Sequence, residues 1–408
     1  MSRLIYFDNN ATTSTAPEVV EAMLPFFSRR YGNPSSMYPF GGEVAAEIKA
    51  AREKTSALLG CEPREVVFTS CGTESDNAAI WAALRTQPDK KHLVVSRVEH
   101  PAIAANVPFL RKLGYRVTEV GVDEKGELLW DQYLEALTPD TALATFLWAN
   151  NETGVLFPIE KMAEAAHDRG ILFHTDAVQA AGKIPLDLAG TKVDMLSISG
   201  HKLHAPKGIG VLYLRRGVKF TPFMIGGHQE SGRRGGTENV PYIIGLGRAA
   251  ELSLANMRDE NTRVKELRDR LEKGLTTAIT HTRVNGGGAP RVPNTTNISF
   301  EYVEGEAILL GLASAGICAS SGSACTSGSL EPSHVLRAMG VPFTAAHGSI
   351  RMSLSVHNTA EEVERVIEVF PPIIARLREM SPFWKGDGPA EDQAMLTCET
   401  GGCQVCGV

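Results

Sequence analysis

Polar residues that could carry out chemistry recur in this sequence directly after short apolar runs. They form Thr73-Glu74-Ser75, Glu99-His100, Asn150-Asn151-Glu152, Asp176-Ala177-Val178-Gln179 and Ser199-Gly200-His201-Lys202. In open parallel sheets, ligands bind beyond the carboxyl ends of the strands. We therefore expect these segments to meet at one site.

Lys202 and Asp176 suggest the kind of chemistry. Most lysines are solvated surface residues. A lysine held among hydroxyl and imidazole groups suits a Schiff-base lysine instead, because its pKa must fall before the amine can attack an aldehyde. A pyridinium ring needs an anion at its nitrogen, which Asp176 could supply, although an aspartate after a strand is also a common helix N-cap.

The segment Ser70-Cys71-Gly72-Thr73-Glu74-Ser75 follows the strand candidate 66–69. A helix start with backbone N–H groups and hydroxyls can hold a phosphate, so Thr73 is a candidate phosphate ligand. An ordinary helix start capped by Glu74 or Asp76 is the alternative. His100 could stack on a ring or move protons, but a lone histidine is weak support.

Cys325 lies in a run of small residues from Ala319 to Ser329 that is too poor in apolar mass to pack as core. The run predicts a mobile, exposed loop from which a thiolate could attack a substrate and then carry a group away. The alternative is a solvent-exposed spectator thiol. We expect Cys61, Cys71 and Cys318 to be small buried hydrophobes.

The end of the chain carries Cys398, Cys403 and Cys406, the last two as a CxxC pair. They could bind a metal, relay sulfur or cycle as a dithiol, but three cysteines lack the fourth ligand of a closed zinc site. A loosely held tail with incidental thiols is equally compatible with the pattern. No firm metal site is predicted.

Composition narrows the class of protein. The 408 residues carry a net charge of -6 and no basic block, which argues against a nucleic-acid surface. No apolar stretch is long enough to span a bilayer, and the N-terminus does not resemble a targeting peptide. We expect a cytoplasmic protein without membrane or nucleic-acid partners.

Between residues 60 and 215, apolar runs alternate with amphipathic stretches, which predicts an α/β fold with a mainly parallel sheet. The strand candidates are 93–96, 143–148, 171–176, 195–199 and 210–214. A helix over about 159–166 and a charged amphipathic helix over about 256–277 are expected, and Gly386 to Pro389 should end the last helix.

The assembly resembles the pyridoxal-phosphate enzymes with the aminotransferase-like fold, and among them the cysteine desulfurases of the NifS and IscS kind. The match begins at Tyr6-Phe7-Asp8-Asn9-Asn10-Ala11-Thr12-Thr13 and continues through Tyr31-Gly32-Asn33-Pro34-Ser35-Ser36 and the strand-end motifs. It reaches Ser321-Gly322-Ser323-Ala324-Cys325-Thr326 and fades after about residue 385.

The resemblance implies a fold type I transferase. Its large domain over 15–255 would hold a seven-stranded sheet between helices. A smaller α+β domain, made of 1–14 and 256–385, would carry the cysteine loop, and 386–408 would form a tail. Thr237, in Gly235-Gly236-Thr237-Glu238-Asn239, would reach into the neighbouring subunit's phosphate site, which implies a homodimer.

The resemblance also implies site roles. Lys202 would form the Schiff base, Asp176 would pair with the pyridine nitrogen, Gln179 would contact the ring hydroxyl, and His100 would stack on the ring. Thr73, Ser199 and His201 would hold the phosphate, and Asn151 would contact both cofactor and substrate. Arg351, Asn151 and Asn33 would bind the substrate, Arg351 through its bidentate fork.

The function implied is removal of sulfur from L-cysteine, leaving alanine and a persulfide on Cys325. An iron-sulfur scaffold protein of the NifU or IscU kind would accept the sulfur, for nitrogenase in particular, and Cys325 could share a cluster with that partner. An aminotransferase, an enzyme for selenocysteine and a non-enzymatic sulfur or metal carrier are the alternatives.

Overall fold

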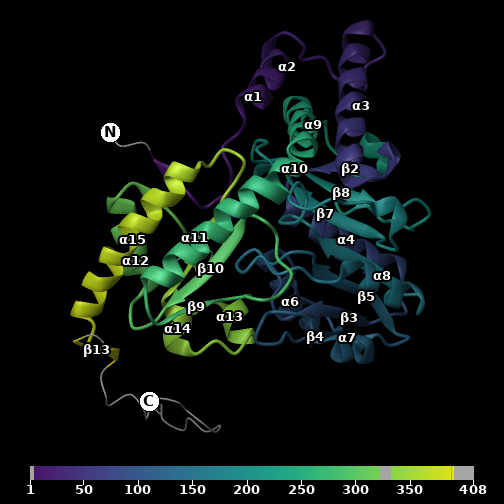
Figure 1. Cartoon of the computed structure of the whole chain (residues 1–408). Coiled ribbons are helices and arrows are strands. Elements are labelled where there is room, and N and C mark those ends of the chain that lie inside the picture. Colours follow the sequence, from purple (N-terminus) through teal and green to yellow (C-terminus); the bar gives the residue numbers. More distant parts are fainter. Residues whose placement is uncertain (1–3, 322–331, 387, 390–408) are drawn as a thin grey trace, which may run out of the picture.

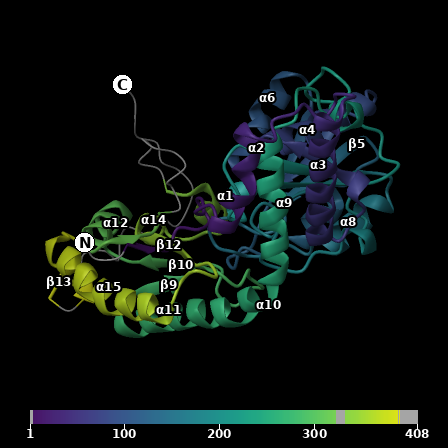
Figure 2. The same ribbon diagram turned by 90° about the horizontal axis from the view of Figure 1, so that it is seen from above.

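The computed structural model describes residues 4–321, 332–386 and 388–389. Cys325, Cys398, Cys403 and Cys406 lie outside the described residues. Figures 1 and 2 show two parts, a larger one built around a wide sheet and a smaller one that lies beside it.

A seven-stranded sheet with the order β2-β8-β7-β6-β5-β3-β4 forms the centre of the larger part. All pairings are parallel except those of β8, which runs antiparallel to β2 and β7. The strands are β2 (Val66–Thr69), β3 (His92–Ser96), β4 (Arg116–Val120), β5 (Thr141–Leu147), β6 (Leu172–Asp176), β7 (Met195–Ser199) and β8 (Gly210–Leu214).

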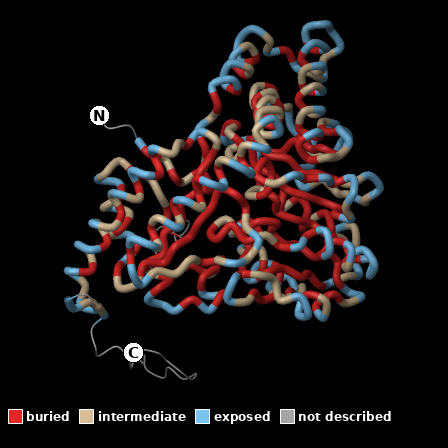
Figure 3. The backbone as a smooth tube through the Cα atoms, in the orientation of Figure 1, coloured by how far each residue is buried: buried red, intermediate tan, exposed pale blue. Residues whose placement is uncertain are grey.

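The predicted strands agree closely with this sheet. The predicted bounds of β2, β7 and β8 are those of the structure, β3 and β6 differ by one residue at the start, and β5 differs by two residues at the start and one at the end. The strand β4 was not among the predicted ones. The strands read as nearly unbroken apolar runs because helices cover them on both faces. The tube in Figure 3 is accordingly red through the sheet.

The predicted helix near residue 159 is α8 (Ile159–His167), and its apolar residues Ile159, Met162, Ala163 and Ala166 are all buried. Gly170 follows it with φ 64, a left-handed conformation that favours glycine. The other helices of this part are α1 (Pro17–Met23), α2 (Pro25–Ser28), α3 (Pro39–Leu59), α4 (Gly72–Thr86), α5 (Pro101–Ala104), α6 (Asn106–Lys112), α7 (Trp130–Ala136) and α9 (Val240–Ala255).

The smaller part contains the antiparallel sheet β12-β10-β9, built from β9 (Thr282–Val284), β10 (Thr295–Phe300) and β12 (Ser349–Ser353). The predicted amphipathic stretch is a continuous helical run of α10 (Met257–Asp259), a π-helical turn (Glu260–Val264) and α11 (Lys265–Ala278). The remaining helices are α12 (Gly305–Ser314), α13 (His334–Ala338), α14 (Phe343–His347) and α15 (Ala360–Met380).

The last helix ends earlier than predicted. The helix α15 stops at Met380, before Ser381-Pro382, whereas Gly386 to Pro389 were expected to end it. Ser381, which precedes Pro382, has the extended backbone (φ -78, ψ 131) that is favoured before proline. Short pairs β1 (Ile5–Tyr6) with β11 (Ile317–Cys318) and β13 (Trp384–Lys385) with β14 (Gly388–Pro389) complete the fold.

The smaller part has its own apolar core, formed by β10, β12, α11, α12 and α15 together with Phe7. Helix α13 instead contributes Val335 and Leu336 to the main core of the larger part. The domain boundaries expected near residues 15, 256 and 386 stay a prediction. Among the described residues, no helix has the length and apolarity needed to cross a bilayer.

Candidate active site

A cavity of about 460 Å³ opens at the carboxyl ends of the parallel strands, between the two parts. Its size suits a small ligand and cofactor. It brings together most of the predicted site residues, namely Thr73, His100, Asn151, Asp176, Gln179, Ser199, His201, Lys202 and Arg351. Asn33 and Thr237 do not line it.

Lys202 lies in the single turn Gly200–Lys202 that follows β7. Its Nζ donates to the carbonyl oxygens of Asn10 at 2.5 Å and Ala11 at 2.6 Å. The amine therefore points into the cavity but is held by the N-terminal segment of the chain. This placement is the partly enclosed one that the sequence predicts for Lys202.

Asp176 ends β6 and faces the same cavity. Its Oδ1 accepts a hydrogen bond from the Val178 N–H at 2.9 Å. A turn and not a helix follows β6, so the alternative of a helix N-cap is wrong, and Asp176 lines the cavity. Burial raises the pKa of Asp176 to about 6, an effect that the Val178 N–H and Lys202 oppose. The carboxylate remains mostly ionised at neutral pH.

Asp76 lies beside Asp176 and was predicted only as a possible helix-capping acid. It is 1% exposed, and its Oδ1 has no hydrogen-bond partner within the described residues. Burial and the charge of Asp176 raise its pKa well above the usual value. Since two like charges in a buried site disfavour each other, Asp76 keeps its proton and Asp176 carries the charge.

The predicted phosphate end lies at the start of α4. Cys71 is the N-cap of this helix, and its Sγ accepts from the Glu74 N–H at 3.4 Å. Cys61, Cys71 and Cys318 were expected to be buried hydrophobes; all three are instead half-buried, and Cys71 lines the cavity. A Cβ on Gly72 would lie 2.9 Å from Val178 Cγ2, so only glycine lets the helix approach the cavity this closely.

Glu74, which was predicted as a possible capping residue of α4, forms hydrogen bonds at the start of this helix. It accepts from the Ser70 N–H at 2.8 Å and from Arg234 Nε at 2.9 Å. Although burial opposes it, these partners hold the pKa of Glu74 below its usual value. Thr73, Ser199 and His201 remain on the cavity wall, and burial, with the nearby charge of Lys202, lowers the pKa of His201 to about 4.

His100 caps the short helix α5, and its Nδ1 accepts from the Ala102 N–H at 3.2 Å. Burial, and next the charge of Lys202, lower the pKa of His100 to about 4. The ring is therefore neutral at neutral pH. Because Nδ1 is an acceptor, Nε2 carries the hydrogen and is available to donate it.

Arg351 lies on β12 and reaches the cavity from the smaller part. Its Nη2 donates to Asp8 Oδ1 at 2.8 Å and its Nη1 to the Asn151 carbonyl at 3.1 Å. Its Nε is buried without a partner in the described structure. Each terminal nitrogen keeps a second N–H that these contacts do not use, so a guanidinium on the cavity wall is suited to receive a carboxylate.

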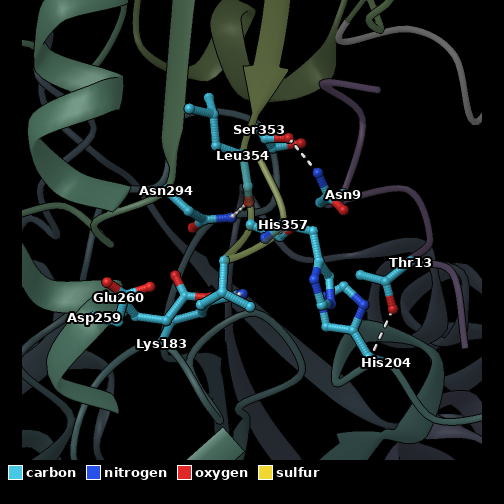
Figure 4. A network of polar contacts seen from close by, with 12 residues as sticks. Asn9, Thr13, Lys183, His204, Asp259, Glu260, Asn294, Ser353, Leu354 and His357 are labelled. Atoms are coloured by element: carbon cyan, nitrogen blue, oxygen red, sulfur yellow. Dashed lines mark hydrogen bonds and ion pairs between the residues drawn. The ribbon is translucent and has the colours of Figure 1, made fainter. Parts of the chain in front are cut away.

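The N-terminal segment 8–16 lies against the Lys202 turn. The Thr13 N–H donates to the His201 carbonyl at 2.9 Å, and the His204 N–H donates to Thr13 Oγ1 at 2.9 Å. Figure 4 shows this contact, with the His204 ring lying against His357. His204 has φ 58, a conformation rare outside glycine, which this segment helps to maintain.

The residues on both sides of 322–331 are fixed near the cavity. Ser320 lines it and pairs with Arg351 through backbone hydrogen bonds. Ser333 Oγ donates to Glu152 Oε2 at 2.5 Å, and His334 bonds the Glu99 carbonyl at 3.0 Å. These residues flank segment 322–331, which contains Cys325, the residue predicted to take up the sulfur.

Sequence reasoning did not assign several residues to the cavity that in fact line it, namely Asp8, Asn10, Cys71, Asp76 and Ser320. Asp8 and Asn10 stood inside a quoted motif, Tyr6 to Thr13, without a role. The sequence signal that could have pointed to Asp8 is a charged residue directly after the short apolar run Leu4 to Phe7. That signal is weak by itself.

Comparisons with known proteins agree with this geometry. Residues 5–366 match the aminotransferase class-V family. The chain is 57% identical over 389 residues, 95% of this chain and 97% of the relative, to the cysteine desulfurase NifS of Azotobacter vinelandii. It is 59% identical, with the same coverage, to a cysteine desulfurase of Gluconacetobacter diazotrophicus.

Solved structures give the same picture. A NifS-like protein superposes with a TM-score of 0.85 at 35% identity, covering 92% of this chain and all of that one. SspA in complex with cysteine superposes with a TM-score of 0.77 at 35% identity, covering 87% of this chain and 100% of the other.

The chain belongs to the aminotransferase class-V family, whose members depend on pyridoxal phosphate. The α/β fold and the likeness to NifS-type cysteine desulfurases expected from the sequence are thereby confirmed. The cavity fits the cofactor, because it offers an amine at Lys202, an anion at Asp176 and a helix start with a glycine where a Cβ would collide. The roles of individual residues stay predictions.

Proposed function

We propose that this chain is a cysteine desulfurase that removes sulfur from L-cysteine, takes it up on Cys325 as a persulfide and releases L-alanine. The observation that carries the proposal is the single cavity that unites Lys202, Asp176 and Arg351. An amine, a buried anion and a guanidinium are the groups needed to hold pyridoxal phosphate and an amino acid at once.

The bound pyridoxal phosphate supplies an electron sink for the pair left behind when the substrate Cα loses its proton. Lys202 is the residue that removes and returns that proton, since its Nζ is the amine in the cavity. Asp176 keeps the proton on the pyridine nitrogen. Thr73, Ser199 and His201 hold the phosphate, and Gln179 and Asn151 are the candidate contacts to the ring side.

His100 stays neutral at neutral pH and can donate its Nε2 hydrogen toward the reacting groups. Arg351 binds the substrate carboxylate, and Asn151 and Asn33 assist in placing the substrate. Cys325 then attacks the substrate sulfur as a thiolate: the new S–S bond replaces the C–S bond, and the three-carbon remainder gains a proton and leaves as alanine.

Thr237 does not line the cavity of its own chain. In a homodimer with shared sites it would instead reach the phosphate site of the neighbouring subunit. Its segment is joined to the preceding turn by the Gly235 N–H, which donates to the Met224 carbonyl at 3.0 Å. Large apolar side chains near this turn are exposed, with Ile225 at 82% and Met224 at 41%. Such exposure supports burial against a second copy.

The sulfur acceptor would be an iron-sulfur scaffold protein in the cytoplasm. The transferred sulfur would be used to assemble the metal clusters of nitrogenase. The support is the likeness to a protein named NifS in Azotobacter vinelandii. Cys398, Cys403 and Cys406 stay candidates for relaying sulfur or binding metal. No group of three or more His, Cys, Asp or Glu in the described parts of the chain is arranged to hold a metal.

Replacement of Cys325 tests the proposal. Cys325→Ala should bind the cofactor and still change its absorbance when cysteine is added, but it should release alanine far below the native rate. Mass spectrometry of the native protein after a short incubation with cysteine should find one extra sulfur on the Cys325 peptide. Native alanine release by Cys325→Ala would refute the persulfide step.

Cys61→Ala is the matched control. Burial raises the pKa of the Cys61 thiol to about 12, so this thiol is not a competent nucleophile at neutral pH. The control should release alanine at the native rate. A carrier without catalysis would acquire sulfur equally well when Lys202 is replaced, which the enzyme would not.

A further inference from the structure

The guanidinium of Arg351 already has a carboxylate partner, Asp8, in the cavity itself. The two side chains are 2.8 Å apart at Nη2 and Oδ1, and they are only 5% and 19% exposed. Both residues line the cavity. The proposed function assigns the Arg351 guanidinium to the substrate carboxylate. Asp8 therefore already uses part of the guanidinium that the substrate would need.

The backbone fixes Asp8 in this place. Asp8 forms a parallel bridge with Ser353, two residues beyond Arg351, and its carbonyl accepts from the Ala11 N–H at 3.0 Å. The Asn10 N–H, two residues further along, donates to Ser353 Oγ at 2.9 Å. The Asp8 side chain thus lies beside Arg351 because its backbone is fixed next to β12.

The donors of Arg351 are unequally used. A guanidinium has five N–H groups, and the contacts to Asp8 and to the Asn151 carbonyl use one on each terminal nitrogen. The Nε–H is buried and has no partner in the described structure. Each terminal nitrogen keeps a second N–H that these two contacts do not use. A carboxylate entering the cavity can take these N–H groups, but it must then share one positive charge with Asp8.

Two carboxylates on one guanidinium repel each other, and the partly enclosed setting screens that repulsion less than water does. Glu152 also interacts with the charge of Arg351, but burial raises the pKa of Glu152 to about 7, so it is only partly charged at neutral pH. Asp8 is therefore the principal anion against which a substrate carboxylate must compete.

We propose that Asp8 is an affinity-tuning residue of the substrate site that competes with amino-acid carboxylates for Arg351. It keeps the buried guanidinium paired before the amino acid binds, weakens binding of every α-carboxylate, and thereby favours release of the alanine product. The inference rests on the proposed function for its substrate class, small α-amino acids.

The test is Asp8→Asn in the cofactor-loaded, full-length protein. Asparagine keeps the shape and a hydrogen-bond acceptor but removes the charge. The dissociation constant of L-alanine, measured by calorimetry and by cofactor absorbance, should fall about ten-fold because the repulsion is gone. The dissociation constant of L-alaninamide, which lacks the carboxylate, should not change, and KM for cysteine should fall more than kcat.

Controls separate this role from others. Arg351→Lys should raise the dissociation constant of alanine, since an ammonium cannot reproduce the fork. An unchanged or raised alanine constant in Asp8→Asn would mean that Asp8 merely orients Arg351, and an equal change for alaninamide would mean a general distortion. Either result overturns the proposal. Should Asp8→Asn not fold, Asp8→Ser, also uncharged, must shift alanine in the same direction.

Alanine binding does not depend on sulfur transfer. A protein that binds alanine more tightly without the Asp8 charge but forms no persulfide would contradict the proposed function and leave this inference standing.

Discussion

Gly210→Ala should weaken cofactor binding without touching any proposed ligand. Gly210 begins β8, and an added Cβ would lie 2.6 Å from the carbonyl carbon of Cys71 and 2.9 Å from its Cα and its oxygen. All three are backbone atoms, which cannot rotate away. Because Cys71 is the N-cap of α4, the start of this helix must shift.

The expected cost follows from the collision. Overpacking a well-packed interior typically destabilises by about 1–3 kcal/mol. Because the strain falls on the helix start next to Thr73, we expect it to appear largely as lost affinity for pyridoxal phosphate, by about ten-fold for each 1.4 kcal/mol. Fluorescence titration of the cofactor-free protein gives the affinity, and chemical denaturation gives the stability.

Gly42→Ala is the control. Gly42 is an exposed residue of α3 with nothing within 4 Å of an added Cβ. Alanine there should leave cofactor affinity unchanged and stabilise by up to about 1 kcal/mol, the helix preference over glycine. Native cofactor affinity together with native stability in Gly210→Ala would refute the reasoning.

Two other predictions concern buried ionisable groups. Lys202→Ala should fold yet lack the cofactor band near ~420 nm and cysteine turnover; intact turnover would remove the assignment. Burial raises the pKa of Glu99 from 4.5 to about 8, so its contribution to stability is present below pH 4.5 and is lost as pH rises to about 8. Glu99→Gln has no carboxyl group to ionise at this position and should not lose stability in this way. The unfolding free energy of Glu99→Gln minus that of the native protein should therefore increase from pH 4.5 to pH 8, by up to about 5 kcal/mol. Parallel pH profiles in urea denaturation would contradict this assignment.

The part of the site that belongs to the larger sheet could be predicted from the sequence. Asp176 ends a strand, and Lys202 and His100 follow one; each of these strands is a short, distinct apolar run, and parallel strands carry such residues to one edge. Local pattern and topology therefore suffice to place them together. The same reasoning missed that β8 is antiparallel, because periodicity does not encode strand direction.

The contribution of the smaller part could not be predicted in this way. Asp8 meets Arg351 across 343 residues of sequence, and Asn10 meets Lys202 across 192. No local spacing reports such contacts, since they depend on how β1 and β12 dock beside the large sheet. Cys71 was misjudged for a related reason: its capping contact depends on the exact first residue of α4, which pattern alone leaves uncertain by a few positions.

Several acids around the cavity are buried, although proteins usually avoid burying charged groups. This departure from the usual pattern points to the cavity as the functional site. Burial raises the pKa of Asp76, Glu99, Glu152 and Asp176, so each costs stability when ionised. Natural sequences retain such conflicts mainly where function requires them. A protonated pyridinium beside Asp176 would offset part of that cost. Since a ligand that binds only the folded state stabilises it, cofactor binding and folding are coupled most strongly at the pH where these acids are charged.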